Sequence, residues 1–444
     1  MLLQKDSEVN FWGWANPRSK IRIIADWNTD TIQTSASNMA KWETLLKTPK
    51  AGGPYTIQVL SEDESISIKN VMIGELWICS GQSNMEFSVN NGVIDAEAAM
   101  PDSENADIRF FFIEKATAAF PQDELTGHWE VCSPESMRKF SSVGYFFGRK
   151  LNEELNTPIG LINSNWGGTP VETWMPKDAI ENVNKIQAEV EFLNDSEGWP
   201  RDIASTYNAM IHPITKMGIA GAIWYQGESN TPNANTYAEL FTTMIKGWRL
   251  KFQNDFPFYY VQIAPFQGYG VPFSAALVRE QQQKASSLEK TGMVVISDLV
   301  DDPDDIHPRY KKEVGNRLAN RALAETYGQE STKYKFATLR EQKIEKGAIR
   351  IFFDNIDGGI SIKGKRIDAL EIAGEDEKFY PANAKIDEKS NTLLVNAKQV
   401  KKPIFVRYMF GNGTIGNLFD KSDLPVAPFR TDKVIYDLST NRPK

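Results

Sequence analysis

Residues 76–84 read LWICSGQSN, an apolar run that stops at a glycine followed by three polar residues. The apolar part is typical of a short strand buried in the middle of a sheet. The polar part has two interpretations: it is either a tight turn, or a strand end that presents Ser83 as a nucleophile. The rest of the chain distinguishes between them.

Four more apolar runs follow, separated by amphipathic segments. The runs are IGLINSN (159–165), GAIWYQ (221–226), FYYVQIA (258–264) and MVVISDL (293–299). Apolar residues have helical spacing within 143–155 and 237–248, and a further helix is predicted over 311–328. Short apolar strands that alternate with helices predict an α/β fold, a three-layer α/β/α sandwich around a parallel sheet.

Strand-like sequence without helical spacing flanks this region on both sides. Before it, the predicted strands are 20–27, 31–35, 53–60 and 65–71. After it, they are 349–355, 360–365, 369–374, 392–397 and 404–410. We therefore predict three units: an N-terminal β-sandwich (1–70), an α/β domain that holds the site (71–330) and a small C-terminal β-sandwich domain (331–444).

The composition excludes several classes of protein. The chain has 444 residues, 41% of them hydrophobic and 24% charged, which is typical of globular domains. Its net charge of -8 and the lack of a basic cluster predict no nucleic-acid partner and no binding to anionic membranes. There is no apolar run of about 18 residues that would span a membrane, and the opening MLLQKDSEV lacks the apolar stretch of a signal peptide.

The two cysteines, Cys79 and Cys132, have no CxxC spacing. This pattern favours neither a zinc site nor a disulfide framework, and a free cysteine in an apolar strand is usually a small core residue. We expect no metal ion and no cofactor.

Polar residues follow the ends of four predicted strands. In an open α/β sheet, ligands bind beyond the carboxyl ends of the strands, so these residues are the candidates for a site. They are the segments GQSNM (81–85), NWGGT (165–169), QGESN (226–230) and VDDPDDIHP (300–308).

A serine needs a neighbouring base to become a nucleophile, and the chain has three histidines. His128 lies in a stretch with no catalytic partner nearby and His212 has no adjacent carboxylate, whereas His307 follows Asp304 by three residues. This spacing allows the carboxylate to fold back onto the imidazole Nδ1–H. The alternatives are a solvated or capping histidine and a calcium loop over 301–305, although that loop lacks the spacing and central glycine of an EF-hand.

Acyl transfer also needs hydrogen-bond donors at the developing oxyanion. The backbone amides of Ser83 and of Gly167 or Gly168 are candidates, since glycine lets the backbone approach a substrate closely. The side-chain amide of Gln226 is a third candidate.

The motifs GQSNM, NWGGTPVETW, WYQGESN and DxxHP resemble those of the sialate O-acetylesterase family, within the SGNH-type (GDSL-like) esterases. GWANP, AGGPYTIQV and GNLFDKSDLPVAPFRTD extend the resemblance over nearly the whole chain. It implies an SGNH hydrolase-like fold and a periplasmic or secreted protein. It also implies that Ser83 is the nucleophile and His307 the base oriented by Asp304, with the glycine pair and Gln226 as oxyanion donors. The sequence departs from the family in two places: the segment between Trp174 and Tyr207 is short, and Gln226 stands where the wider superfamily has asparagine.

These observations predict a serine-dependent carbohydrate O-acetylesterase that acts through an acetyl-enzyme, with O-acetylated sialic acid as the first substrate. One alternative is an esterase for acetylated xylan or another plant polysaccharide with the same mechanism. The other is an inert glycan-binding protein, which the intact set of Ser83, Asp304 and His307 argues against. Trp166, Trp174 and Trp224 are candidates to stack on a sugar, but core packing is the expected role of each.

Overall fold

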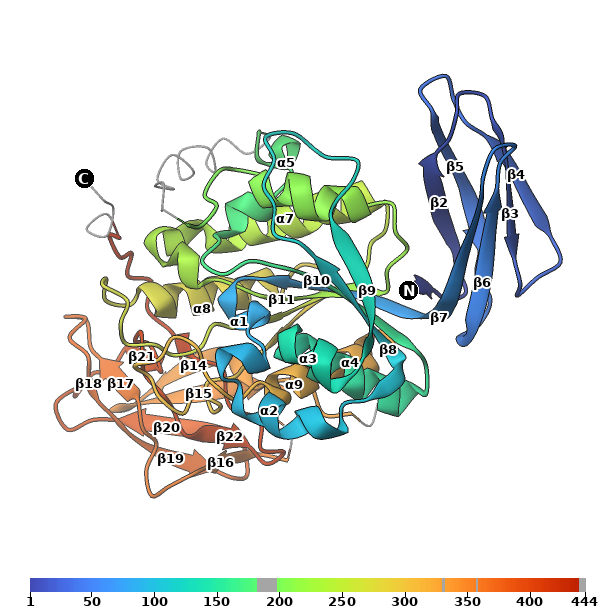
Figure 1. Ribbon diagram of the computed structural model, residues 1–444. Coiled ribbons are helices and arrows are strands. Elements are labelled where there is room, and N and C mark those ends of the chain that lie inside the picture. The colour runs from blue at the N-terminus through green and yellow to red at the C-terminus, as the bar shows by residue number, and fades with distance from the viewer. Residues whose placement is uncertain (182–197, 330–331, 357, 439–444) are drawn as a thin grey trace.

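The computed structural model describes residues 1–181, 198–329, 332–356 and 358–438 (Figure 1). Within these residues, the central strands belong to a mixed 11-stranded sheet, with the order β13-β12-β11-β7-β10-β8-β9 along its main path. They are β7 (Ser65–Gly81), β8 (Asn105–Ile113), β9 (Gly127–Cys132), β10 (Ile159–Asn165), β11 (Gly221–Tyr225), β12 (Phe258–Val261) and β13 (Thr291–Val294). Neighbours along this path are parallel except β8 and β9, so the sheet is not purely parallel as predicted.

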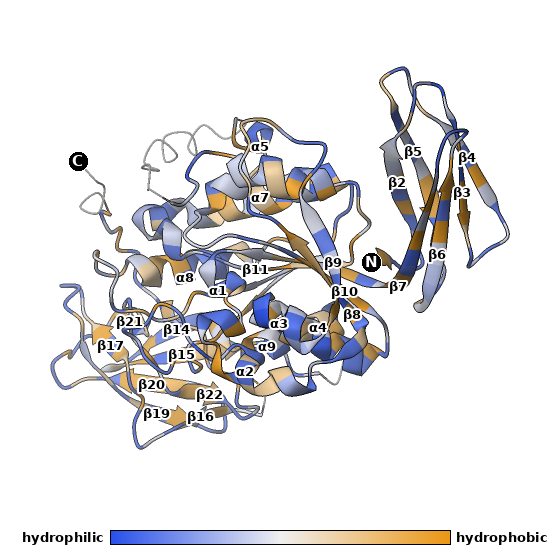
Figure 2. Cartoon of the chain, in the orientation of Figure 1, coloured by the Kyte–Doolittle hydropathy of each residue, from blue (hydrophilic) through white to orange (hydrophobic). Residues whose placement is uncertain are grey.

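Helices cover both faces of the central strands (Figure 1). One face carries α3 (Pro134–Lys139), α4 (Ser142–Leu155) and α9 (Lys312–Glu325), and the other α5 (Lys177–Glu181), α7 (Tyr237–Phe252) and α8 (Ser274–Ala285). The strands between them are strongly apolar, as Figure 2 shows, and their side chains form the largest hydrophobic core. The predicted helices correspond to α4, α7 and α9, whereas α8 was not anticipated.

β7 is one long strand, although the sequence predicts two separate strands at 65–71 and 76–80. Its first half pairs antiparallel with β6 (Gly52–Leu60), and its second half lies between β10 and β11. Gly74 lies where the two halves meet, and a Cβ there would come within 1.9 Å of the Pro158 carbonyl oxygen. Glycine therefore allows the strand to run on past a crowded backbone contact. The predicted boundary after residue 70 falls inside this strand.

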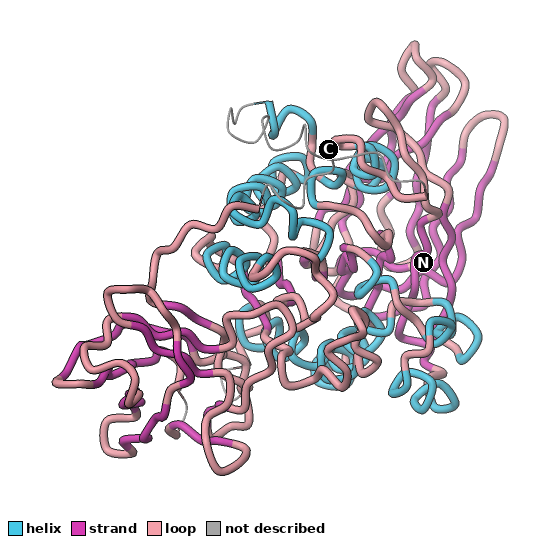
Figure 3. Tube along the Cα trace, turned by 90° about the vertical axis from the view of Figure 1, so that its left-hand side faces the viewer, coloured by secondary structure: helices cyan, strands magenta, loops and turns pink. Residues whose placement is uncertain are grey.

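β-rich regions lie at the two opposite ends of the molecule (Figures 1 and 3), and each has its own hydrophobic core. The N-terminal region contains β1 (Leu2–Gln4), β2 (Glu8–Trp14), β3 (Lys20–Ala25), β4 (Thr31–Ser35), β5 (Lys41–Lys47) and β6. The C-terminal region contains β14 (Thr338–Glu345), β15 (Ala348–Asp354), β16 (Ile360–Ile362), β17 (Leu370–Ala373), β18 (Tyr380–Pro381), β19 (Asn383–Asp387), β20 (Thr392–Asn396), β21 (Phe405–Tyr408), β22 (Leu418–Asp420) and β23 (Phe429–Arg430). The division of the chain into three folding units stays a prediction.

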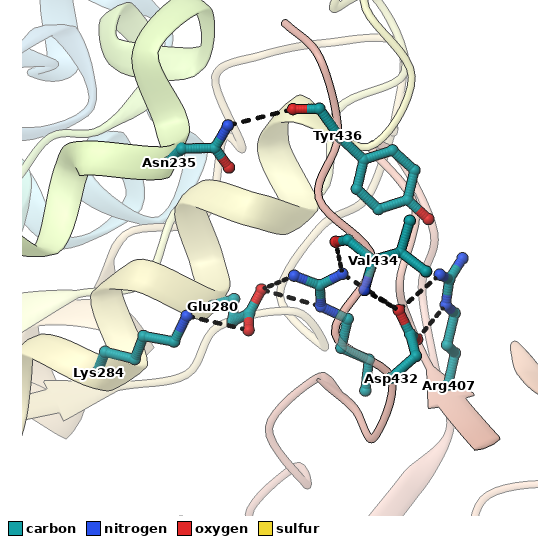
Figure 4. A network of polar contacts seen from close by, with 8 residues as sticks. Asn235, Glu280, Lys284, Arg407, Asp432, Val434 and Tyr436 are labelled. Carbon is teal, nitrogen blue, oxygen red and sulfur yellow. Dashed lines mark hydrogen bonds and ion pairs between the residues drawn. The ribbon is translucent and has the colours of Figure 1, made fainter. Parts of the chain in front are cut away.

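A buried polar network joins the C-terminal region to α8 (Figure 4). The carboxylate of Asp432 accepts two hydrogen bonds from Arg407, at 2.7 and 2.9 Å, and one from Arg430 at 3.2 Å. Arg430 also binds Glu280 of α8 at 2.9 Å. The C-terminal region is thus tied to a helix that packs on the central sheet.

Across the described ranges, no helix is long and apolar enough to cross a bilayer.

Candidate active site

Ser83 is the first residue of α1 (Ser83–Glu86), the short helix that follows β7. The turn between them needs Gly81, whose φ of +135° is in the region that favours glycine. A Cβ on Gly81 would also come within 2.2 Å of the Tyr225 carbonyl oxygen. The strand-end turn therefore places a partly exposed Ser83 at the carboxyl end of the sheet.

His307 lies directly against Ser83, although 224 residues separate them in the sequence. Its Nε2 is 2.9 Å from the Ser83 Oγ, which is hydrogen-bond distance. The imidazole stacks on the ring of Phe87, with 4.1 Å between the ring centroids. Burial and the positive charge of Lys311 lower the pKa of His307. The negative charges of Asp305 and Glu86 raise it, but by less, so the pKa lies below its ordinary value. Near neutral pH the imidazole is therefore uncharged and able to accept a proton.

The structure does not bring Asp304 to this imidazole. Its side chain is exposed, and its backbone amide donates to the Asp302 carboxylate at 2.9 Å. Asp305 is the carboxylate beside the ring: its Oδ1 is 3.9 Å from Nδ1 and accepts a hydrogen bond from the backbone amide of His307 at 2.8 Å. A separation of 3.9 Å is too long for a hydrogen bond. In this conformation neither aspartate completes a hydrogen-bonded triad.

The other two histidines lie away from Ser83. His128 is on β9 and contacts Glu130 at 2.9 Å. His212 Nδ1 is 3.0 Å from the carbonyl oxygen of Gln122. Neither is a competitor for the role of base.

The predicted oxyanion donors differ in their availability. The amide of Gly167 donates to Glu86 Oε2 at 2.6 Å, and Lys115 binds the other oxygen of Glu86, also at 2.6 Å. A Cβ on Gly167 would lie 3.3 Å from that of Ser83, so the glycine is adjacent to the serine. The amides of Ser83 and Gly168 have no acceptor among the residues that the structure describes.

Gln226 does not face Ser83, so its predicted role as an oxyanion donor does not match the structure. The side chain is fully buried. Its amide nitrogen donates to Asn230 at 2.7 Å and to the Thr169 carbonyl at 3.3 Å, and its oxygen accepts from Tyr237 at 2.9 Å. Both polar atoms of the Gln226 side chain are therefore already hydrogen-bonded to other buried residues.

Gln82 and Asn84, on either side of Ser83, bind segments that are distant in the sequence. Gln82 Oε1 accepts from the amides of Gly227 and Ser229, at 3.3 and 3.2 Å. Asn84 donates to Glu228 Oε1 at 2.7 Å and to the Ile306 carbonyl at 3.1 Å. The two residues fix the turn of Ser83 against the loop after β11 and the loop that carries His307.

Two exposed or partly exposed tryptophans, Trp166 and the unpredicted Trp199, are candidates for contact with a sugar. Trp174 and Trp224 are fully buried, as expected for core residues, whereas Trp166 is partly exposed. Trp199 is 53% exposed, and its ring packs so closely on Gly168 that a Cβ there would overlap it. Trp199 is not predicted from the sequence, because no neighbouring motif marks it.

Within the described part of the chain, no three His, Cys, Asp or Glu side chains are grouped as metal ligands. The predicted short segment between Trp174 and Tyr207 includes residues 182–197, which lie outside the described residues.

Comparisons with known proteins agree with one another. The model of a family described as "Carbohydrate esterase, sialic acid-specific acetylesterase" matches residues 73–324. A solved carbohydrate acetylesterase from Xanthomonas citri is 33% identical, with a TM-score of 0.89, and the match covers 98% of this chain and 97% of that one. Sialate O-acetylesterases from Rattus norvegicus and Homo sapiens are 27% and 28% identical, over 76% of this chain and 73% and 71% of theirs.

Proposed function

Because the chain belongs to the family of sialic acid-specific carbohydrate acetylesterases and is a carboxylic ester hydrolase, we propose that it removes O-acetyl groups from sugars with Ser83 as its nucleophile. The observation that carries this proposal is the 2.9 Å contact between Ser83 Oγ and His307 Nε2. A serine paired with a neutral imidazole at a sheet's carboxyl edge is the arrangement that acyl transfer requires. The two-sided covering of the sheet supports an SGNH hydrolase-like three-layer sandwich as the fold.

In the proposed reaction, Ser83 Oγ attacks the acetyl carbonyl carbon while His307 Nε2 takes its proton. The tetrahedral intermediate then collapses, the C–O bond to the sugar breaks, and His307 returns the proton to the departing sugar oxygen. Water, deprotonated by the same imidazole, then attacks the acetyl carbonyl carbon. The bond from that carbon to Ser83 Oγ breaks, acetate leaves, and His307 returns the proton to Oγ. Each proton therefore passes through Nε2, and Ser83 is regenerated.

We assign the oxyanion contacts to the backbone amides of Ser83 and Gly168. Among the described residues neither amide has an acceptor, whereas the amide of Gly167 is held by Glu86 and Gln226 is buried. Donors that are fixed before the reaction stabilise the developing charge without the cost of reorganisation.

The residue that orients His307 comes from the acidic loop at 301–305. The DxxH motif implies Asp304, but the distance to Nδ1 favours Asp305. Catalytic hydrogen bonds in unliganded sites are often long and tighten when substrate binds, so the 3.9 Å separation is compatible with a role for Asp305.

O-acetylated sialic acid is the proposed substrate, because curated relatives over most of the chain are sialate O-acetylesterases. The similarity to a solved enzyme described more broadly as a carbohydrate acetylesterase keeps acetylated plant polysaccharides as the alternative. An inert glycan-binding role is disfavoured by the paired serine and histidine.

An acetate-release assay tests this function with 9-O-acetylated sialic acid, acetylated xylo-oligosaccharides and p-nitrophenyl acetate. We expect Ser83→Ala to lose several orders of magnitude in kcat on every substrate while keeping the wild-type Tm. His307→Ala should behave similarly, and His128→Ala, which alters an exposed histidine on β9, should keep full activity. Normal turnover by a folded Ser83→Ala protein would refute the serine mechanism.

A further inference from the structure

Lys311 is a fully buried lysine directly behind the proposed site. It lies between the loop that carries His307 and the start of α9. Its Nζ donates to Asn84 Oδ1 at 2.6 Å and lies 5.2 Å from the centroid of the Tyr225 ring. A buried ammonium group is expensive, and lysine is almost never fully buried unless it is paired, so this position calls for a physical reason.

Asn84 connects the lysine to both catalytic segments. It follows Ser83 in the chain, accepts the hydrogen bond from Lys311, and donates to the carbonyl of Ile306, the residue before His307. Its second hydrogen goes to the buried carboxylate of Glu228 at 2.7 Å. The Asn84 side chain therefore joins α1, the loop that carries His307 and the loop after β11. Lys311 fixes this side chain by donating to its oxygen.

The charges around Lys311 and His307 come from several elements. Burial lowers the pKa of Lys311 to about 7, against the opposing charges of Glu228, Asp95, Asp305 and Asp301. Burial also raises the pKa of Glu228, although a backbone amide, Asn84 and Lys311 oppose the increase. The imidazole experiences the positive charge of Lys311 against the negative charges of Asp305 and Glu86. Below about pH 7 the lysine is therefore the positive charge that disfavours the imidazolium.

We propose that Lys311 is a positioning residue of the esterase reaction, which holds Ser83 and His307 in register through Asn84. Its positive charge also opposes protonation of the imidazole. This inference rests on the proposed function, because it needs Ser83 and His307 as the reacting pair. It adds a residue that touches neither the acetyl group nor the serine oxygen.

Lys311→Met tests both parts of the proposal. The change leaves the buried Asn84 Oδ1 without its donor and removes the positive charge near the buried Glu228 carboxylate, so we expect the Tm to fall. Loss of the tether should lower kcat roughly 10- to 100-fold with KM changed by less than about threefold, since misplacement by about 1 Å costs on that order. Loss of the charge should raise the pKa of His307, so the acid limb of kcat/KM should move to higher pH.

Lys311→Gln separates the two contributions. Glutamine keeps a donor for Asn84 but carries no charge, so it should lose less kcat than Lys311→Met while showing the same shift of the acid limb. The matched control is Lys312→Met, an exposed neighbour whose side chain lies outside the network and whose removal should leave the pH profile unchanged.

The readout is kcat, KM and the pH profile on p-nitrophenyl acetate, with Tm measured for each variant and Ser83→Ala run in parallel. Wild-type kcat and an unshifted acid limb in folded Lys311→Met would overturn the inference. If Lys311→Met does not fold, the acid limb of Lys311→Gln decides in the same way, and failure of both to fold would make Lys311 purely structural and also overturn it. An active Ser83→Ala protein would instead refute the proposed function itself.

Discussion

At the scale of single residues, the chemistry of Ser83 depends on side chains that do not react. Gln82 and Asn84 bind two loops from elsewhere in the chain, the loop after β11 and the loop that carries His307, so Ser83 is held on both sides. Glu86, on the same short helix, holds the amide of Gly167. The GQSN segment is therefore both the strand end that carries the proposed nucleophile and the point at which the surrounding loops are joined.

Asp305→Asn and Asp304→Asn should affect turnover and its pH dependence differently. Because the charge of Asp305 raises the pKa of His307, Asp305→Asn should lower that pKa and move the acid limb of kcat/KM to lower pH. Its kcat should fall roughly 10- to 100-fold, less than the about 10⁴-fold loss in a triad with a hydrogen-bonded carboxylate. Asp304→Asn, which alters an exposed side chain, should stay near wild type. Turnover against pH for both variants checks this.

The reverse result, with a severe loss in Asp304→Asn and a mild one in Asp305→Asn, would show that Asp304 reaches the imidazole in the substrate complex. The assignment from the DxxH motif would then be right, and the assignment from distance wrong.

At the scale of elements, the loops that follow the central strands have different roles. The turn after β7 provides the serine, and the loop after β13 provides the histidine. The loop after β11 provides no reacting group: Gln226, Glu228 and Asn230 are buried and hold the neighbouring turns. A motif at a strand end thus marks a site without showing which of its residues face the substrate.

Trp199 offers a test of how the surface beside Gly168 contacts a sugar. If its exposed ring stacks on the substrate, Trp199→Ala should raise KM for an acetylated sugar about tenfold, from a stacking contribution of about 1–1.5 kcal/mol. KM for p-nitrophenyl acetate, which has no sugar ring, should change little. Trp14→Ala, a tryptophan of similar exposure (47%) on the N-terminal β region, is the control. An equal rise in KM for both esters would assign Trp199 to loop structure and not to sugar binding.

Elements with a regular apolar pattern were predictable from the sequence, and the others were not. The continuous apolar runs of β10 and β11 and the helical spacing of α4 and α7 identified these elements. β2 was missed because most of its residues are only partly buried, which leaves no clear alternation. β7 was divided in two because its first half is exposed and its second half is buried.

The site was predictable only in part, for a similar reason. Ser83 and His307 follow from strand ends and the scarcity of histidines. The occupied amide of Gly167 and the burial of Gln226 depend on pairings between segments more than 50 residues apart. Lys311 has no signal in a single sequence, because lysine is normally solvated.

At the scale of the whole molecule, the C-terminal β region supports the catalytic part through contacts on α8 and the segment before it. Asn412 accepts from the amide of Ala275 at 3.0 Å and donates to the carbonyl of Val271 at 2.8 Å. The amide of Gln267 in turn binds the carbonyl of Pro303, in the acidic loop before His307, at 2.8 Å. The C-terminal region is thus connected to the loop that carries His307 through a short chain of contacts.

Asp432 holds the two arginines of the ionic network that joins the C-terminal region to α8. Its carboxylate is fully buried between Arg407 and Arg430, so Asp432→Asn leaves two buried guanidinium groups under-compensated. We expect the free energy of unfolding to fall by about 3 kcal/mol, with kcat unchanged where the protein remains folded. Lys284→Met, which removes an exposed ion pair with Glu280, should cost less than about 1 kcal/mol. Chemical denaturation of both variants measures the difference, and equal stability would contradict the role given to Asp432.

The stabilisation that the Asp432 carboxylate provides should depend on pH. Burial raises the pKa of Asp432, but the bonds and charge of Arg407 outweigh it, so the folded pKa lies below the ordinary value. The stabilisation is therefore present above the unfolded pKa and is lost as the pH falls through the folded pKa.

The central claim is that Ser83 carries the acetyl group during turnover. The most direct measurement is rapid acid quenching of the enzyme with p-nitrophenyl acetate, followed by mass spectrometry of its peptides. We predict a single acetyl group on the peptide that contains Ser83 in the wild-type protein, and none in Ser83→Ala. Turnover without an acetylated Ser83 peptide at any quench time, together with acetate release by Ser83→Ala, would contradict the account.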